Sequence, residues 1–374
     1  MKKKKVLYLI PHLQNQGPVI QLYSLVKNID LQQFSLHILT IFPEREKSMV
    51  DQFRKIGVEV VCGNFEKWRI ISQKRFISEA IKKMKPDIVH SCSTITDGLC
   101  ASLNIRQPLI ITLHNNIYED VAVQYGKLVG GYLCWKEKKA IMEADCVVTC
   151  SNTLKVQYEK FIPGNYVAIP NGIEIEEWKN DSGLDKNELR EKLGLPQDQF
   201  IILSTGALIE RKNPIAVIEA FKEADIKNAV LLMLGDGNLM EQCKHAATEK
   251  VLFTGRVNNV KEYLYAADLL ISASSAEGMP YAILEAKCTG IPMILSDIPQ
   301  HREAVKNDEN EIAFFNVGNK EEIRELIIEK QNEKSHNLNY HVEEHSASNM
   351  GERYMDIYRV LYKSSKNCGK MIGR

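Results

Sequence analysis

The chain has 374 residues, 44% of them hydrophobic, and its 48 basic and 48 acidic residues cancel at pH 7. This length exceeds the usual size of one hydrophobic core and predicts two domains. No apolar run approaches the roughly 18 residues that span a bilayer, and Pro11 interrupts the only apolar stretch near the N-terminus, so we expect a cytoplasmic protein without a signal peptide.

Short apolar runs alternate with helical patterns from the N-terminus onward, which is typical of a parallel sheet covered by helices. Helices are expected between the strands, for example at 17–28 and 74–85. The strands predicted in the first half are residues 5–10, 35–41, 58–63, 87–93, 109–114 and 145–151. Residues 1–173 hold 23 basic against 15 acidic side chains, so this half has a surface suited to anionic partners.

The alternating pattern starts afresh after a junction near residues 166–178. The strands predicted in the second half are residues 200–208, 229–237, 250–257, 268–275 and 292–298. Apolar residues at helical spacing in 350–362 predict a terminal helix. The fold class is therefore α/β, with one doubly wound domain at 1–165 and another at 166–349, and with a C-terminal helix at about 350–374 packing back on the first.

Cysteine usage and common motifs exclude several classes of site. No CxxC pair is present, so we expect reduced thiols packed like small apolar residues and no metal site. The nine cysteines are Cys62, Cys92, Cys100, Cys134, Cys146, Cys150, Cys243, Cys288 and Cys368. GxGxxG, GxxxxGK[ST] and GxSxG are absent, so dinucleotide-binding, P-loop and serine-hydrolase functions have no motif in their favour.

Polar residues gather where predicted strands end. Ligands of parallel α/β sheets bind outside these carboxyl ends, and two such domains in tandem predict a cleft between them. Gly17 and Gly206 each follow a strand and precede a helix. The adjacent Arg211 and Lys212 are either a clamp for a diphosphate or an ordinary surface turn. His114 is either a hydrogen-bond donor to a ligand or a satisfied loop histidine.

The stretch EGMPYAILE, residues 277–285, carries one carboxylate at each end of an otherwise apolar segment. Gly278 permits an unusual backbone conformation, and Pro280 suits the first position of a helix. We therefore predict a helix over 280–289. Glu277 would lie in the loop before it and Glu285 within it, in different surroundings.

Taken in order, these pieces resemble the retaining glycosyltransferases of family 4, which have the GT-B fold. The resembling segments are PDIVHS (86–91), LIITLHNN (109–116), IPNGIE (169–174), STGALIERKNP (204–214), LLMLGDGNL (231–239) and the block 266–305. The last block contains the acid-x7-acid signature of the family. The resemblance implies two Rossmann-like doubly wound parallel-sheet domains that face each other across a cleft.

The resemblance also implies a reaction: a hexose-type sugar passes from a nucleotide-diphosphate sugar, expected to be a UDP-sugar, to a hydroxyl group, with its anomeric configuration kept and without cofactor or metal. By resemblance, Glu277 binds hydroxyls of the donor sugar, and Glu285 binds the ribose. Arg211 and Lys212 would stabilise the leaving diphosphate, and His114 would touch the sugar near the reacting carbon. The other positions that match donor-binding residues are Gly17, Gly206, Arg256, Val257, Gly278, Met279, Pro280 and Tyr281.

Two positions depart from the family pattern. Ala207 stands where many members have Arg, and Pro18, which has no amide hydrogen, follows Gly17 where a second glycine is common. Alternative functions are another GT-B activity, such as a sugar-phosphate synthase or a nucleotide-sugar 2-epimerase, or a catalytically silent sugar-binding or partner subunit.

Two segments of the first domain combine basic residues with aromatic and aliphatic ones. Residues 67–85 and 125–139 form either ordinary amphipathic helices that cover the sheet or helices that rest on an anionic membrane. The hypothesis is peripheral attachment to the inner face of the cell membrane, with a lipid-linked saccharide as acceptor in surface polysaccharide biosynthesis. A nucleic-acid partner is not expected.

Overall fold

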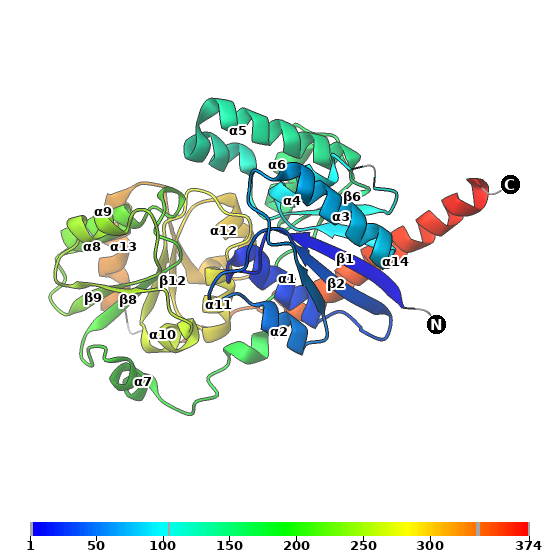
Figure 1. Cartoon of the computed structure of the whole chain (residues 1–374). Helices are drawn as coiled ribbons and strands as arrows, with labels where there is room; N and C mark the ends of the chain where they lie inside the picture. Colours follow the sequence, from blue (N-terminus) through cyan, green and yellow to red (C-terminus); the bar gives the residue numbers. More distant parts are fainter. Residues whose placement is uncertain (1–2, 104, 334–336, 373–374) are drawn as a thin grey trace. The chain divides into compact units, whose positions relative to one another are not determined.

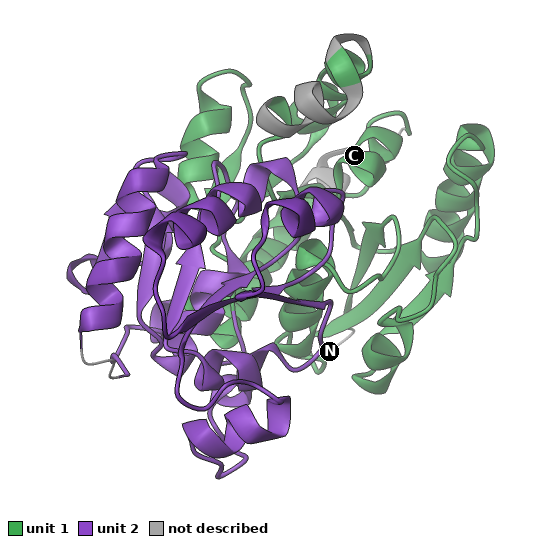
Figure 2. Cartoon of the chain, turned by 90° about the vertical axis from the view of Figure 1, so that its left-hand side faces the viewer, with its two compact units in different colours: residues 1–172, 345–374 green, residues 173–344 purple. Residues whose placement is uncertain are grey.

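The computed structural model describes residues 3–103, 105–333 and 337–372, apart from the side chains of residues 119–125, 127–128 and 366–372. The chain forms two compact units, residues 1–172 with 345–374 (unit 1) and residues 173–344 (unit 2), which Figure 2 shows in green and purple. Each unit contains one parallel sheet with helices, so the predicted pair of doubly wound α/β domains is confirmed.

Unit 1 is built on a seven-stranded sheet in the order β3-β2-β1-β4-β5-β6-β7. Its strands are β1 (Lys4–Ile10), β2 (Phe34–Thr40), β3 (Glu59–Cys62), β4 (Ile88–Ser91), β5 (Leu109–Leu113), β6 (Cys146–Thr149) and β7 (Tyr166–Ala168). The chain moves outward in one direction from β1 and in the other from β4, so the strand order reverses between these two strands. All the predicted strands of this half are present, and only β7 was not expected.

The helices of unit 1 are α1 (Gly17–Lys27), α2 (Val50–Lys55), α3 (Ile70–Met84), α4 (Thr94–Cys100), α5 (Ile117–Glu143), α6 (Asn152–Glu159) and α14 (Ala347–Ile372) (Figure 1). Local sequence fixes several of their starts, since the Ser93 and Ser151 hydroxyls cap α4 and α6. Long helix α5 is kinked at Gly126, where φ is 73°. Among the described residues no helix combines the length and the apolar character needed to cross a membrane.

Helix α14 is tied into the core of unit 1 by tyrosines. The Tyr358 hydroxyl lies 3.0 Å from the Tyr8 hydroxyl and 2.9 Å from His90 Nδ1, all in the buried core. The start of α14 packs closely on Gly172, the last residue of the first segment of unit 1. A β-carbon built at Gly172 would lie only 2.7 Å from Ala347 Cα.

The expected division of the chain between residues 165 and 166 needs a correction. Strand β7 pairs in parallel with β6, so it completes the first sheet, and the division falls after Gly172. At the other end, unit 1 resumes at His345 rather than near residue 350. Three residues of strand are too short for the apolar pattern to reveal β7.

Unit 2 has a six-stranded parallel sheet in the order β10-β9-β8-β11-β12-β13. Its strands are β8 (Phe200–Thr205), β9 (Ala229–Leu234), β10 (Val251–Gly255), β11 (Leu269–Ser272), β12 (Met293–Ser296) and β13 (Ile312–Phe315). Its helices are α7 (Lys186–Leu193), α8 (Pro214–Ala224), α9 (Met240–Ala246), α10 (Val260–Ala266), α11 (Tyr281–Thr289), α12 (Pro299–Ala304) and α13 (Lys320–Asn332). The helix predicted at 280–289 is α11, which begins at Tyr281 with Pro280 as its N-cap.

Candidate active site

The strand order of unit 2 reverses between β8 and β11, and such a switch point is where open α/β sheets bind ligands at the carboxyl ends of the strands. The chain after β8 forms the 3-10 turn Glu210–Lys212, and the chain after β11 leads to Glu277. The Ser275 amide donates to the Arg211 carbonyl oxygen at 2.9 Å, so the backbones of the two segments are joined.

Three charged side chains predicted for the site meet at this point. Arg211 Nη1 lies 2.8 Å from Glu277 Oε2, and Lys212 Nζ pairs with Glu277 Oε1. The Ser274 hydroxyl donates to Oε1 at 2.7 Å. Arg211 also donates to the carbonyl oxygen of Ala276 at 2.6 Å. Glu277 is 7% exposed and the two cations are 24% and 21% exposed, so the cluster is largely shielded but reachable from solvent.

The cluster keeps Glu277 ionised. Burial raises the pKa of Glu277, but the charges of Lys212 and Arg211, with hydrogen bonds from Lys212 and Ser274, outweigh burial and lower this pKa to about 2. At neutral pH the three side chains therefore carry one net positive charge. A carboxylate fixed between two cations can accept hydrogen bonds, and the cations can attract an anionic group.

Glu285 lies about one turn into α11, and its surroundings differ from those of Glu277. Its side chain is half-buried and makes no hydrogen bond or ion pair with any described residue. Burial raises the pKa of Glu285 to about 7, although Lys212 lowers it. Lys287 on the same helix is engaged elsewhere, with its Nζ 2.9 Å from Asp308 Oδ2. The prediction of two acids in different surroundings is confirmed.

The glycines at the ends of β8 and β9 allow two backbone segments to touch. A β-carbon at Gly235 would lie 1.8 Å from the carbonyl oxygen of Gly206, and both glycines have positive φ, 140° and 138°. Gly206 therefore belongs to the base of the site, beside Lys212. The remaining predicted donor-binding positions of unit 2 also lie at carboxyl ends of strands or at the start of α11. They are exposed Arg256 and half-buried Val257 after β10, buried Gly278, Met279 and Pro280, and half-buried Tyr281.

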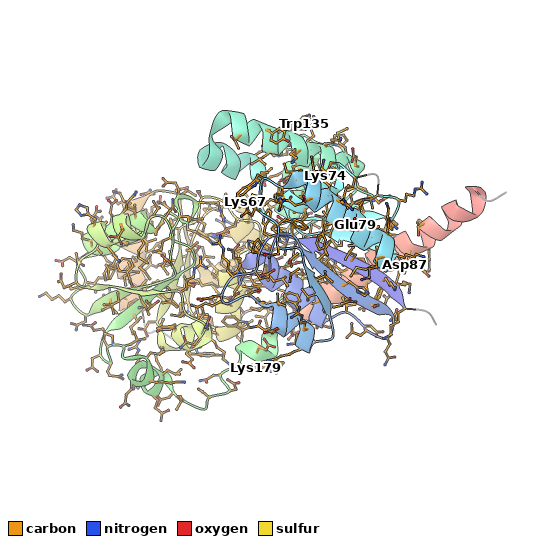
Figure 3. The ribbon with its side chains drawn as sticks, viewed as in Figure 1. Lys67, Lys74, Glu79, Asp87, Trp135 and Lys179 are labelled. Atoms are coloured by element: carbon orange, nitrogen blue, oxygen red, sulfur yellow. The ribbon has the colours of Figure 1, made fainter. Side chains whose placement is uncertain are left out.

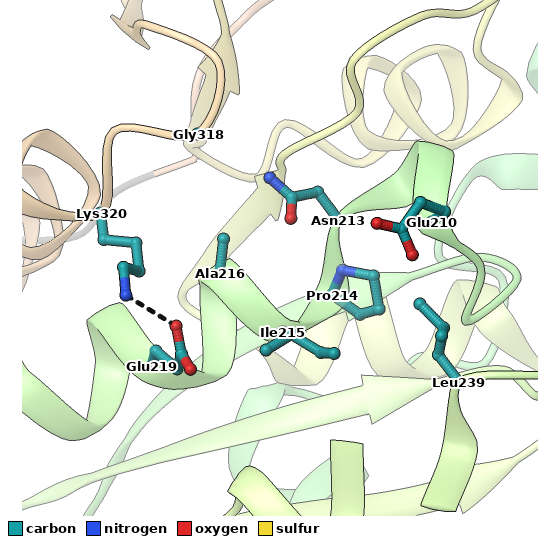
Figure 4. Close-up of a pocket in the computed structure, with 9 residues that line it drawn as sticks. All are labelled: Glu210, Asn213, Pro214, Ile215, Ala216, Glu219, Leu239, Gly318 and Lys320. Atoms are coloured by element: carbon teal, nitrogen blue, oxygen red, sulfur yellow. Dashed lines mark hydrogen bonds and ion pairs between the residues drawn. The ribbon is translucent and has the colours of Figure 1, made fainter. Parts of the chain in front are cut away.

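A pocket of about 310 Å³ opens beside the same turn but is not lined by the charged cluster. Figure 4 shows Glu210, Asn213 and Pro214 on one side of it and the ion pair of Lys320 with Glu219, 2.8 Å apart, on the other. Arg211, Lys212 and Glu277 are not among its lining residues. The pocket therefore borders the turn that carries the cations without enclosing them.

Two predicted site residues belong to unit 1. His114 follows β5, and its Nε2 is buried with no hydrogen-bond partner in the part of the chain that the structure describes. Burial lowers the pKa of His114 to about 4, although a hydrogen bond to the Cys92 backbone raises it, so the ring is neutral at pH 7. Gly17 begins α1, and no atom lies within 4 Å of a β-carbon built there, so contacts within the chain do not require glycine at this position.

Family models match nearly the whole chain. The model described as Glycosyltransferase Family 4 matches residues 16–177, and the model described as Glycosyl transferases group 1 matches residues 185–345. The chain belongs to the family 4 glycosyltransferases. The resemblance to family 4 that was stated from the sequence is thus confirmed.

Two relatives agree with this assignment, and one solved structure shows the fold. The glycosyltransferase is 29% identical to the UDP-Gal:alpha-D-GlcNAc-diphosphoundecaprenol alpha-1,3-galactosyltransferase of Escherichia coli, over 80% of this chain and 82% of the relative. It is 24% identical to the O-antigen biosynthesis glycosyltransferase WclY of Escherichia coli, over 96% of this chain and 99% of the relative. The crystal structure of Anabaena HepE in complex with UDP and glucose superposes with a TM-score of 0.79 at 16% identity, covering 95% of this chain and 99% of that one. The fold of the glycosyltransferase is GT-B.

Sequence reasoning missed the residues that support Glu277 from behind. Ser296 Oγ donates to the Ser274 carbonyl oxygen at 2.6 Å, and His301 Nδ1 lies 3.1 Å from Ser296 Oγ. All three residues are fully buried, so the glycosyltransferase holds the loop before Glu277 by a polar network within its core. Serine and histidine are common in loops, and nothing in their spacing distinguishes these.

Proposed function

We propose that the enzyme transfers a hexose-type sugar from a UDP-sugar to a hydroxyl of a lipid-linked saccharide in surface polysaccharide biosynthesis, with the anomeric configuration retained. The observation that carries the proposal is the cluster of Arg211, Lys212 and Glu277 at the switch point of unit 2. The Escherichia coli galactosyltransferase supports the choice of substrates, because its name contains both a UDP-sugar and a diphosphate-linked acceptor.

The cations suit the main demand of this reaction. The bond to a nucleoside diphosphate is already polar, so stabilising the negative charge of the departing diphosphate is the largest contribution that the protein can make. Arg211 and Lys212 are held side by side by one carboxylate and need little reorganisation to meet a diphosphate. They would do this without a metal ion, and Arg211 would take the part of the arginine that many members have at position 207.

Glu277 is assigned to orienting the donor sugar. Its low pKa keeps it an acceptor for sugar hydroxyls. Both of its oxygens are already bound, one to Arg211 and the other to Lys212 and Ser274, which restrains the carboxylate and makes it a poor nucleophile. Retention would then follow from attack on the side of the leaving group, with the leaving phosphate as base.

Glu285 and His114 complete the proposed contacts. Glu285 has hydrogen-bond capacity that no described residue uses, and a carboxylate can accept from both hydroxyls of a ribose. A neutral His114 that donates from Nδ1 to the Cys92 backbone presents Nε2 as an acceptor. His114 would therefore accept a hydrogen bond from the transferred sugar rather than donate one.

A transfer assay tests this function. The purified enzyme is incubated with a panel of nucleotide sugars and a diphosphate-linked saccharide, with and without EDTA, and NMR of the product gives the anomeric configuration. We expect K212Q and R211Q each to lower kcat by about 100-fold. K222Q is the matched control, because Lys222 is an exposed lysine on α8 without an ion pair among the described residues. An inverted product, or wild-type turnover by K212Q, would contradict the proposal.

We also propose that unit 1 docks on an anionic membrane surface. Trp68 and Ile71 at the start of α3 are 75% and 85% exposed, and Tyr132 and Trp135 on α5 are 54% and 59% exposed. Lys67 is exposed beside Trp68, and Figure 3 shows Lys67, Lys74 and Trp135 on this part of the unit. Exposed aromatic and aliphatic side chains among lysines suit an interfacial position.

The expected surface also included Tyr125, Lys127 and Leu128, whose side chains lie outside the described residues. Vesicle sedimentation tests the docking: the enzyme should sediment with anionic vesicles, and the variant W68S/W135S should lose most of that binding. The matched control is F161S, because Phe161 is an aromatic residue of unit 1 that is as exposed as Trp68 and belongs to neither helix. Equal recovery from anionic and neutral vesicles would rule the docking out.

A further inference from the structure

A second cavity lies in unit 1, with a volume of about 550 Å³. Its walls come from the loop after β2, from α2 and from the residues at and after the end of β3, so it is located at the carboxyl edge of the sheet. Arg45, Lys47 and Arg54 line it, with Asn64 and Cys62. This edge is where parallel sheets bind ligands, and no role proposed above uses these residues.

The cavity carries an excess of positive charge, because its lining holds three cations, Arg45, Lys47 and Arg54, against the two acids Glu44 and Asp51. Arg45 and Lys47 are exposed, and neither side chain has a hydrogen bond or ion pair with any described residue. The lining acid Glu44 pairs with neither of them: its carboxylate accepts from the Leu13 amide at 3.0 Å and from the Ser48 hydroxyl at 2.7 Å. Arg54 has a loose contact, 3.6 Å, with Asp51 and donates from Nη2 to the Val60 carbonyl oxygen at 3.4 Å.

The wall that carries Arg45 and Lys47 is fastened to the loop that leads to Gly17. The Met49 amide donates to the Leu13 carbonyl oxygen at 2.8 Å, and Gln14 and Ser48 form an isolated antiparallel bridge. Two lining residues other than glycine adopt positive φ, Lys47 at 65° and Asn64 at 55°. This backbone conformation is unfavourable for lysine, and structures retain such strain mostly where a side chain must be aimed.

We propose that the cavity lined by Arg45 and Lys47 is a binding subsite for the diphosphate group of the acceptor. A guanidinium and an ammonium that face one open pocket match the oxygens of a diphosphate, and a planar guanidinium can bind two of them at once. The choice of acceptor rests on the proposed transfer to a diphosphate-linked saccharide. The binding of an anion in this cavity does not depend on that transfer, so the subsite and the proposed function can fail separately.

Cys62 gives a local reporter, because its thiol is exposed and lines the same cavity. The rate of alkylation of Cys62 by iodoacetamide is measured by peptide mass spectrometry, with inorganic pyrophosphate or farnesyl diphosphate as the probe. We expect either probe to slow alkylation at Cys62, and pyrophosphate to leave the rate at Cys134 unchanged. In R45Q/K47Q the probe concentration needed for half protection should rise about tenfold or more.

The double variant K55Q/K160Q is the matched control, because it also removes two exposed lysines of unit 1 that line no cavity here and have no ion pair among the described residues. In this control, each probe should protect Cys62 at the same concentration as in the wild type. K47G guards against misfolding, since glycine suits the positive φ while the cation is lost; it should fold at least as well and still bind pyrophosphate more weakly.

Each outcome has a separate meaning. Absent protection in the wild type, or equal protection in R45Q/K47Q, overturns the subsite. Protection by pyrophosphate and not by farnesyl diphosphate refutes its assignment to a lipid-linked acceptor and identifies a free-phosphate site. Without acceptor, R45Q/K47Q and the wild type should hydrolyse UDP-sugar at the same rate. If the wild type turns over no donor at all, the proposed function is rejected, while the result on anion binding still holds.

Discussion

The substitution E277Q tests how the cluster of Arg211, Lys212 and Glu277 works. The amide has the shape of the carboxylate but no charge, so two cations that are about one quarter exposed lose their common partner. Removal of one member of a buried ion pair is destabilising because the remaining charge is uncompensated. We therefore expect E277Q to lose stability as well as sugar transfer.

The magnitude follows from the pKa of Glu277, which is about 2 in the folded protein against 4.5 as its ordinary value. This difference corresponds to about 3 kcal/mol of stability from the charged form. Because the folded-state pKa is lowered, the contribution is complete above pH 4.5 and decreases as the pH falls towards 2. It should be about 3 kcal/mol at pH 7 and about 2 kcal/mol at pH 3.5.

Urea unfolding at the two pH values measures this contribution. E277Q should be less stable than the wild type by about 3 kcal/mol at pH 7, and the deficit should be smaller at pH 3.5. E210Q is the control, since Glu210 is an exposed acid of the same turn with no partner among the described residues. Equal stability of E277Q and wild type at pH 7, or a deficit independent of pH, would refute the electrostatic account of the cluster.

Three further substitutions test other parts of the structure. Because the pKa of Glu285 is raised to about 7, its ionisation destabilises the fold as the pH rises from 4.5 to 8. In thermal unfolding, E285Q should be more stable than the wild type by about 3 kcal/mol at pH 8 and equally stable at pH 4.5. Calorimetry should show that E285Q binds UDP more weakly. D308N removes the carboxylate 2.9 Å from the buried Lys287 ammonium, which keeps the Ala304 carbonyl oxygen at 3.0 Å and the Glu344 carboxylate at 3.7 Å. The urea stability of unit 2 should fall by about 3 kcal/mol, the lower end for breaking a buried ion pair; unchanged stability would mean that the pair is not formed. Y358F removes the hydroxyl between Tyr8 and His90 and should lower the stability of unit 1 by about 1–3 kcal/mol. The amides of α14 should then exchange hydrogen faster than in the wild type, and unchanged or slower exchange would contradict this.

The strands were predictable because buried parallel strands are almost wholly apolar. β9 is buried at every residue and β4 likewise, so each stands out as a short hydrophobic run between polar loops. β7 and β13 were not predicted. β7 has only three residues, and β13 follows directly on the acidic turn Glu309–Glu311, so neither forms a run long enough to identify.

The residue types of the candidate site were predictable, but their contacts were not. The spacing of Glu277 and Glu285 and the Arg211-Lys212 pair were visible in the sequence, whereas the ion pairs join residues separated by more than 60 positions. The ion pairs also add a stability cost to any neutral substitution of Glu277, which no spacing pattern indicates.

The opposite effects of the two acids on stability favour a ligand-binding role for Glu285. At pH 7 the charged form of Glu277 contributes about 3 kcal/mol to folding, while the high pKa of Glu285 costs about 3 kcal/mol, so the pair nearly cancels. Glu277 has protein partners that explain its burial. Glu285 has none among the described residues, and a glutamine would fit the same space without the electrostatic cost. A half-buried acid that weakens the fold at neutral pH is explained most directly by a hydrogen-bonding partner from outside the chain, and a pair of ribose hydroxyls has that chemistry.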